Sequence, residues 1–213
     1  PVKRLLGGTR AVEAGDLEVE ILVKTHDELA TLATSFNHMV VGLREKERIR
    51  ATFGQYVDPR IVKNLLENRL AADRGERQVM TVFFSDLEGF TRMCEGLTPD
   101  AAVRFLNRYF AMMADVIRGR QGIVDKYIGD SVMAFWGAPL PQPDHARRAV
   151  LAALTCQERL RPFCDALVAR GGPRLVTRIG LNSGVCVVGN MGSRDRFDYT
   201  AIGDTVNLAS RLE

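Results

Sequence analysis

The chain has 213 residues, and its 46% apolar composition is sufficient for one sizeable domain with a smaller element beside it. Charged residues make up 26% of the chain and the formal net charge is only +3, so this balance argues against nucleic acid or an anionic membrane surface as the main partner. Four cysteines without C-x-x-C spacing indicate reduced thiols of a cytosolic protein, and neither a zinc site nor a disulfide framework.

Residues 1 to about 57 have the pattern of two helices joined by a connector over residues 14–23. The second helix is predicted over residues 25–50, where Thr25 and Glu28 fit a capping box. Its apolar residues recur at steps of three and four, which is typical of a coiled-coil seam but also of an amphipathic helix on a globular core. These residues are Leu29, Leu32, Phe36, Met39 and Leu43.

This region resembles a HAMP domain, the parallel two-helix unit that relays signals from membrane receptors. The resemblance covers residues 1–46 and is carried by Pro1, Ala14-Gly15-Asp16-Leu17, Asp27-Glu28-Leu29 and Phe36-Asn37. Because HAMP units usually follow a transmembrane helix, it implies the cytosolic part of an inner- or plasma-membrane receptor, with the N-terminal transmembrane region outside this chain. The chain itself has no signal peptide and no apolar run near the roughly 20 residues of a membrane span, so we expect it to be soluble.

Residues 47–78 are predicted to form a helical linker between the HAMP domain and the region that begins at Val79. Asp58-Pro59 marks a helix start, and the polar residues 67–78 are predicted to be a loop. The apolar register slips after Leu43, which changes local winding and favours an element that transmits a signal over an inert spacer.

From Val79 the pattern changes to mixed α/β. Residues 78–86 are predicted to be a strand, and the next element is a helix with Thr98 as its cap and Pro99 as its first residue. A hairpin is predicted after this helix, with its turn near Ile128-Gly129-Asp130. The apolar face of the helix is predicted to consist of Val103, Leu106, Phe110, Met113 and Ile117.

The remaining elements complete the prediction of fold class. A second helix is predicted over residues 144–172, with a kink or a break at Pro162, and strands over residues 173–192 precede a last helix. The order strand, helix, two strands, helix, strand predicts an α+β domain with a ferredoxin-like antiparallel sheet and helices packed on one face.

Two aspartates follow or interrupt the β-rich runs and are the first candidates for chemistry. Because the first strand and the central hairpin are neighbours in a ferredoxin-like sheet, Asp86 and Asp130 could hold one or two Mg²⁺ ions. The turn after Asp86, Glu88-Gly89-Phe90-Thr91, could cradle phosphate oxygens with its backbone N–H groups. Taken alone, each of these features is better explained as an ordinary turn.

Separated motifs in a fixed order change that assessment. They are VFFSDLEGFT (82–91), KYIGDSVMAFWG (126–137), YTAIGDTVNLASRLE (199–213) and, as a weaker match, GVCVVGNMGS (184–193). In this order they resemble the class III nucleotidyl cyclases, the family of adenylyl and guanylyl cyclases. The resemblance covers residues 79–213 and implies a catalytic domain that is incomplete at its C-terminus, because family members continue through further strands and a helix.

The resemblance implies a role for each matching residue. Asp86, Asp130 and the backbone of Leu87 would hold Mg²⁺ or Mn²⁺, two ions per site, and the turn of Gly89, Phe90 and Thr91 would hold the substrate phosphates. Both ions would neutralise charge on the reacting phosphates.

Four further residues match the family positions that bind the nucleoside and the α-phosphate. Lys126 would donate to adenine N1 and Thr200 would accept from its exocyclic amine, whereas guanylyl cyclases typically carry glutamate and cysteine there. Asn207 and Arg211 are four residues apart and share one helix face. In the family, the asparagine orients the ribose and the arginine stabilises charge on the α-phosphate.

The resemblance also implies a homodimer, in which the metal aspartates of one subunit face the purine, ribose and arginine residues of the other. The predicted function is an adenylyl cyclase, regulated through a HAMP stalk, that converts ATP to 3′,5′-cyclic AMP and pyrophosphate. The first alternative is a guanylyl cyclase, which Lys126 and Thr200 oppose. The second is a non-catalytic regulatory module, which the presence of both metal aspartates and of Arg211 opposes.

Overall fold

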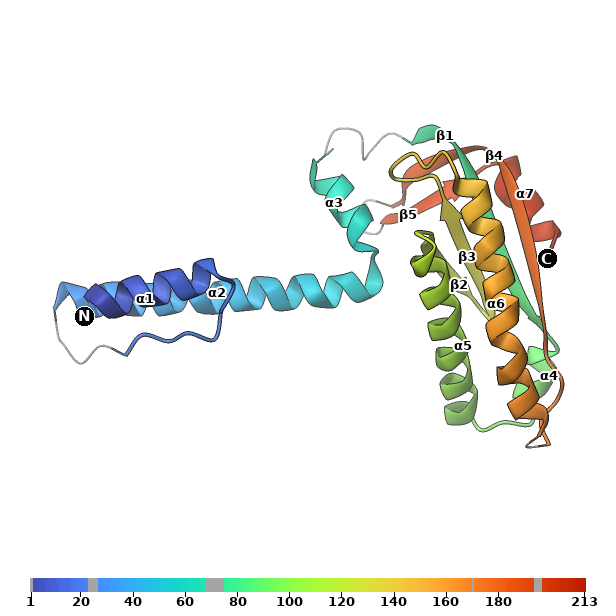
Figure 1. The fold of residues 1–213 in the computed structure, drawn as a ribbon, viewed down its shortest axis with the longest axis horizontal. Helices are drawn as coiled ribbons and strands as arrows, with labels where there is room; N and C mark the ends of the chain where they lie inside the picture. The colour runs from blue at the N-terminus through green and yellow to red at the C-terminus, as the bar shows by residue number, and fades with distance from the viewer. Residues whose placement is uncertain (1, 23–26, 68–74, 170, 194–196) are drawn as a thin grey trace. The chain divides into compact units, whose positions relative to one another are not determined.

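The structure is a computed structural model that describes residues 2–22, 27–67, 75–169, 171–193 and 197–213. The chain divides into two compact units, residues 1–59 and residues 60–213, and each is described by itself (Figure 1). Pro1 and the predicted capping residue Thr25 lie outside the described residues. Among the described helices, none is both long and apolar enough to cross a membrane.

The first unit pairs two helices through an extended connector. Helix α1 spans Val2–Glu13, and helix α2 spans Glu28–Tyr56, so α2 continues past the predicted end at residue 50. Asn37 of α2 forms two hydrogen bonds with Ile21 of the connector. Its side-chain oxygen accepts from the N–H of Ile21 over 2.9 Å, and its side-chain nitrogen donates to the carbonyl of Ile21 over 3.0 Å. One side chain thus satisfies both polar groups of a connector residue that is itself buried.

The small core of this unit uses only part of the predicted seam. Ala33, Phe36 and Val40 of α2 are buried together with Ile21 of the connector. Leu32 and Met39, which belong to the predicted seam, are 54% and 49% exposed. The apolar residues of α2 therefore divide between a face that packs within the chain and a face that is open, and a seam between two chains stays a prediction.

The second unit is built on one five-stranded antiparallel sheet. Its strands are β1 (Glu76–Glu88), β2 (Ile123–Ile128), β3 (Ser131–Trp136), β4 (Val176–Gly192) and β5 (Phe197–Ile202). They lie in the order β2-β3-β1-β4-β5, and the first four follow the strand order of a ferredoxin-like fold. The predicted α+β fold class is confirmed. The predicted hairpin is also confirmed, since Ile128 pairs with Ser131 around a two-residue turn in which Gly129 has a φ of 64°.

The start of β1 differs from the prediction. Residues 76–78, predicted to belong to a loop, are the first residues of β1, because they pair with residues 186–188 of the long strand β4. A polar segment extends the sheet here because a partner strand is available, which local composition does not reveal. The helix predicted at Pro59 is present as α3 (Pro59–Glu67).

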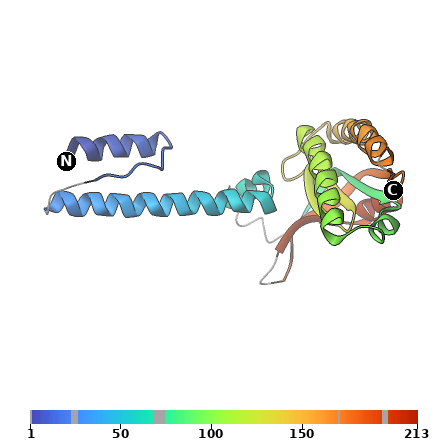
Figure 2. The same cartoon turned by 90° about the horizontal axis from the view of Figure 1, so that it is seen from below.

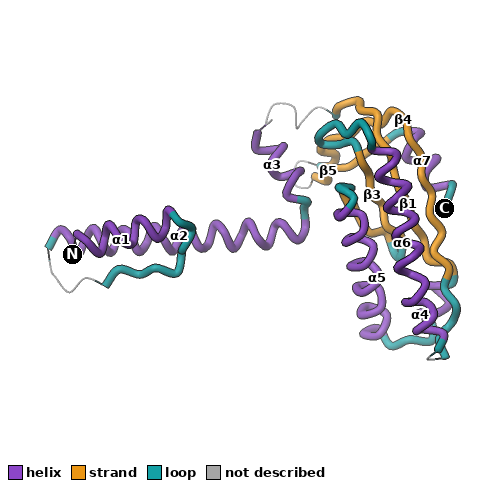
Figure 3. Tube along the Cα trace, in the orientation of Figure 1, coloured by secondary structure: helices purple, strands orange, loops and turns teal. Residues whose placement is uncertain are grey.

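Four helices surround the sheet. They are α4 (Phe90–Cys94), α5 (Pro99–Gly119), α6 (His145–Val168) and α7 (Asp204–Arg211). Helices α5 and α6 lie side by side on one face, as predicted (Figures 2 and 3). Thr98 caps α5 by accepting from the N–H of Ala101 over 3.4 Å, and Pro99 is its first residue. Helix α6 is not broken at Pro162.

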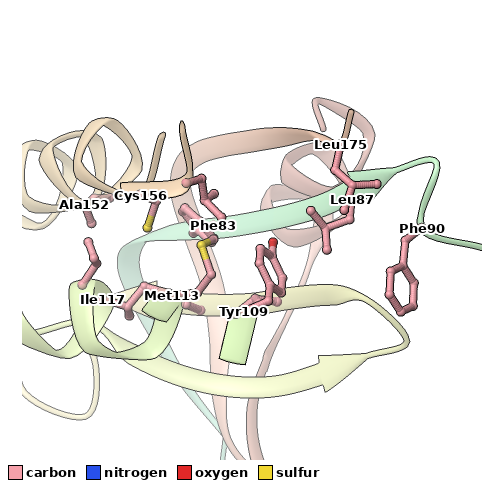
Figure 4. Close-up of a cluster of buried hydrophobic side chains, with 14 of the residues drawn as sticks. Phe83, Leu87, Phe90, Tyr109, Met113, Ile117, Ala152, Cys156 and Leu175 are labelled. Atoms are coloured by element: carbon pink, nitrogen blue, oxygen red, sulfur yellow. The ribbon is translucent and has the colours of Figure 1, made fainter. Parts of the chain in front are cut away.

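The main core lies between these two helices and the sheet (Figure 4). Phe83 and Leu87 of β1 pack there against Tyr109 and Met113 of α5. Met113 and Ile117 of the predicted face are buried, but Val103 is 56% exposed, and Tyr109, which was not predicted, is buried. The hydroxyl of Tyr109 lies within hydrogen-bond distance of the Ser85 hydroxyl, at 3.3 Å, which offsets the cost of burying it.

Helix α7 lies on the opposite face of the sheet. Side chains alternate along a strand, and Ile179 and Leu181 of β4 pack towards the helix-covered core, so Gly180 between them faces the other way. A Cβ atom on Gly180 would lie 2.1 Å from the carbonyl oxygen of Ala209 in α7. Glycine at this position is what allows α7 to lie directly on β4.

Candidate active site

The two candidate aspartates lie beside each other where β1 meets the β2–β3 hairpin. The hydroxyl of Ser131 donates to Asp86 Oδ1 over 3.3 Å, and the N–H of Leu87 donates to Asp130 Oδ2 over 3.2 Å. Asp86 does not end its strand as predicted, because β1 continues to Glu88 by pairing with the start of β4. The strand therefore presents Asp86 from its interior, at a position that pairing with β4 fixes in place.

The electrostatics and the donor atoms of this pair suit a hard cation. Burial raises the pKa of Asp130, and the neighbouring charge of Asp86 raises it further. Two carboxylates and the backbone carbonyl of Leu87 are the oxygen donors that Mg²⁺ or Mn²⁺ prefers, and a bound cation would relieve the repulsion between the two acids. Within the described part of the chain, no group of three or more His, Cys, Asp or Glu side chains is placed to hold a metal. A metal ion held by these two carboxylates would keep coordination positions for substrate oxygens.

Arg178 is a charged neighbour that the sequence did not indicate. It lies directly opposite Asp86 in the β1–β4 register, and its Nη2 donates to Asp86 Oδ2 over 2.6 Å. A metal ion at Asp86 would have to share that carboxylate with a guanidinium or displace it. Glu213 is also near, since burial raises the pKa of its carboxyl and the charge of Asp86 raises it further.

The predicted phosphate turn is a left-handed glycine followed by a short helix. Gly89 has a φ of 85°, a conformation that glycine adopts without steric cost, and α4 begins at Phe90. The side chain of Phe90 is buried and stacks on Phe105 with 5.8 Å between ring centroids, while Thr91 is exposed. Because the core takes up the Phe90 side chain, any phosphate contact there would come from the backbone of the turn.

Lys126 and Thr200 meet at a third residue, Asp125, which the sequence did not single out. Thr200 Oγ1 donates to Asp125 Oδ2, and Lys126 Nζ lies 3.8 Å from Asp125 Oδ1 and 4.0 Å from Asp198 Oδ2. Strands β2 and β5 are the two ends of the strand order, so this contact joins opposite edges of the sheet. The rings of Phe135 on β3 and Tyr199 on β5 also approach each other, with 6.5 Å between centroids.

The two candidates on α7 point away from their own chain. Asn207 and Arg211 are exposed, whereas Ala209 between them is buried against the sheet. Neither the Asn207 nor the Arg211 side chain makes a hydrogen bond or an ion pair with any described residue. The single chain therefore brings Asp86 and Asp130 together, and Lys126 and Thr200 together, but leaves Asn207 and Arg211 without a contact to either pair.

Comparison with known proteins identifies the family. Residues 73–213 match the model of the adenylate and guanylate cyclase catalytic domain, and residues 1–45 match the HAMP domain model. The chain belongs to this cyclase family. The resemblance seen in the sequence is confirmed, and a HAMP domain precedes the cyclase domain.

The similar proteins include cyclases of both purine types. Adenylate cyclase 1 of Rhizobium meliloti (strain 1021) is 38% identical over 200 residues, which are 93% of this chain and 29% of that protein. The solved guanylyl cyclase Cya2 is 42% identical with a TM-score of 0.61, covering 65% of this chain and 71% of that one. The solved adenylyl cyclase CyaB from P. aeruginosa is 39% identical with a TM-score of 0.63, covering 65% and 72%. This chain therefore spans well under half the length of the curated relatives it matches, 29% of Adenylate cyclase 1 and 38% of the next.

Proposed function

We propose that the cyclase domain converts ATP to 3′,5′-cyclic AMP and pyrophosphate. The observation that supports this choice of purine is the meeting of Lys126 and Thr200 at Asp125. The Lys126 ammonium is only a donor and suits adenine N1, while the Thr200 hydroxyl can accept from the adenine amine. Guanine presents an N–H at position 1 and a carbonyl at position 6, so the same two groups match it poorly.

In this proposal the carboxylates of Asp86 and Asp130, with the backbone carbonyl of Leu87, hold two Mg²⁺ or Mn²⁺ ions at each site. When bound, these ions neutralise phosphate charge and lower the pKa of the ribose 3′-hydroxyl. The backbone of the turn at Gly89, Phe90 and Thr91 holds the phosphates.

The residues of α7 act on the sugar and on the reacting phosphorus. Asn207 orients the ribose so that its 3′-oxygen attacks the α-phosphorus in line with the departing pyrophosphate. Arg211 stabilises the charge that develops on the α-phosphate, because its guanidinium is permanently charged and can contact two phosphate oxygens at once.

We also propose that two subunits share each site, with Asp86 and Asp130 from one and the α7 residues from the other. The side chains of Asn207 and Arg211 support this, since they are exposed and have no partner among the described residues. Leu208 on the same helix and Leu212 directly after it are 48% and 55% exposed, an apolar surface that a second copy would cover. The HAMP domain would then form the parallel stalk of the homodimer and link it, on the cytosolic side, to a membrane receptor region.

A guanylyl cyclase is the second candidate, because the 42% identical solved structure of Cya2 is one. The purified protein should be incubated with ATP or with GTP, each in Mg²⁺ and in Mn²⁺, and the cyclic nucleotides quantified by mass spectrometry. We expect cyclic AMP to form at least about tenfold faster than cyclic GMP, because mismatched polar groups in a binding site are heavily penalised. Predominant cyclic GMP would reverse the purine assignment, and no product from either nucleotide would favour a regulatory module.

A further inference from the structure

We propose that Asp125 sets the purine preference of the cyclase, by holding the Thr200 hydroxyl as a hydrogen-bond acceptor towards the base. This inference rests on the proposed role of Lys126 and Thr200 in ATP binding. Asp125 acts through these two residues and is a positioning residue.

The geometry makes Asp125 the shared neighbour of both purine-binding candidates. Its side chain is only 2% exposed, although it carries a carboxylate. One of its oxygens accepts from Thr200 Oγ1, and the other lies 3.8 Å from Lys126 Nζ. A buried acid of this kind needs such partners, because transferring an unpaired carboxylate out of water is costly.

The charge of Asp125 fixes the direction of the hydrogen bond. Burial raises its pKa to about 6, while the hydrogen bond from Thr200 and the charge of Lys126 oppose that rise and Asp198 adds to it. The carboxylate is therefore ionised at neutral pH and can only accept. A hydroxyl has a single hydrogen, and Thr200 gives it to Asp125. Only the lone pairs of Thr200 Oγ1 then remain for a ligand.

A free threonine hydroxyl can donate or accept, but this constraint leaves the Thr200 hydroxyl able only to accept a hydrogen bond from the purine. An adenine amine at position 6 can donate to those lone pairs, whereas the carbonyl of guanine or hypoxanthine places one acceptor against another. Without Asp125, the Thr200 hydroxyl could rotate and donate to that carbonyl. Threonine alone would then select neither purine, and the part of the preference that is read at position 6 depends on the Asp125–Thr200 pair.

Binding of nucleotides that cannot react separates this role from catalysis. We would measure the Kd of the chain for 3′-deoxy-ATP and for 3′-deoxy-ITP, which differ only in the purine and lack the attacking hydroxyl. Four proteins are compared: wild type, Asp125→Asn, Thr200→Val and the double variant. Asparagine keeps the volume of aspartate, but its amide can turn an NH₂ group towards Thr200 and release the hydroxyl.

We expect wild type to favour 3′-deoxy-ATP by about ten- to a hundredfold, the range that one unpaired buried group produces. Each single substitution should lower the ratio of the two Kd values several-fold, to the part that Lys126 supplies at position 1 of the purine, and the double variant should lower it no further. Asp198→Asn is the matched control, because it removes the other carboxylate near Lys126 and does not touch Thr200. Its ratio should equal that of wild type.

Each other outcome contradicts the proposal and points to a different role for Asp125. If Asp125→Asn weakens both nucleotides equally and preserves their ratio, Asp125 contributes only to affinity or folding. If the two single effects add in the double variant, Asp125 and Thr200 act independently. A wild-type protein that binds both analogues equally would contradict the ATP proposal itself, whereas a wild-type preference that is undiminished in Asp125→Asn would contradict only the role of Asp125.

Discussion

Asp130→Asn is expected to reduce cyclic AMP formation about 10³-fold while leaving the fold intact. Stabilisation of phosphate charge by a metal is worth several kcal/mol, and each 1.36 kcal/mol corresponds to a factor of ten in rate. The asparagine oxygen can still accept from the N–H of Leu87, the contact that ties the hairpin to β1. Initial rates with ATP and saturating Mg²⁺ measure the first effect, and thermal unfolding followed by circular dichroism measures the second.

The exposed carboxylate of Asp115 on α5 provides the control for that experiment. Asp115→Asn removes the same charge from the same domain, away from the proposed metal site, and should leave the rate within about twofold. An Asp130→Asn protein that keeps a tenth or more of the wild-type rate would contradict the metal-binding role. A fall in Tm that accompanies the loss of activity would instead make Asp130 a structural residue.

Gly180→Ala should be the most destabilising single-methyl substitution in the cyclase domain. The new Cβ would lie 2.1 Å from the carbonyl oxygen of Ala209 and 2.7 Å from the N atom of Glu213. Both are backbone atoms, so no side chain can rotate to make space and α7 must move away from β4. Overpacking of this kind costs about 3 kcal/mol, which corresponds to a fall in Tm of roughly 6–12 °C for a domain of this size. Differential scanning calorimetry measures the shift.

The activity of Gly180→Ala should fall as well, because Asn207 and Arg211 are carried by the displaced helix. Gly119→Ala is the matched control, since a Cβ at that position, at the end of α5, would meet no atom within 4 Å. Its Tm should equal or slightly exceed that of wild type, because alanine favours the helical conformation more than glycine does. A Gly180→Ala protein with wild-type Tm would mean that α7 does not pack directly on β4.

The fold could be predicted from sequence to the level of element order but not to the level of strand register. Alternating apolar residues, the Thr98-Pro99 helix start and the Gly129-Asp130 turn are local signals, and each predicted its element correctly. The start of β1 and the continuation of that strand past Asp86 depend on pairing with β4, which lies far along the chain. No local pattern reveals such pairing, since an available partner decides it.

The residues of the candidate site could also be predicted only in part. Asp86 and Asp130 could be placed together because the first strand of a ferredoxin-like sheet carries one and the turn of the neighbouring hairpin carries the other. Asp125 and Arg178 were missed because their partners, Thr200 and Asp86, are 75 and 92 residues away. Asp125 also stands directly before a lysine, where an acidic residue is easily taken for one half of a surface ion pair.

The most direct test of a shared cyclase site is restoration of activity between two inactive variants. Asp130→Asn lacks one half of the proposed shared site and Arg211→Ala lacks the other, so each alone should form almost no cyclic AMP. Co-expressed in equal amounts, they should recover about a quarter of wild-type activity, because half of the dimers are mixed and each mixed dimer has one intact site. Activity no greater than the sum of the two separate variants would contradict an adenylyl cyclase site built from two subunits.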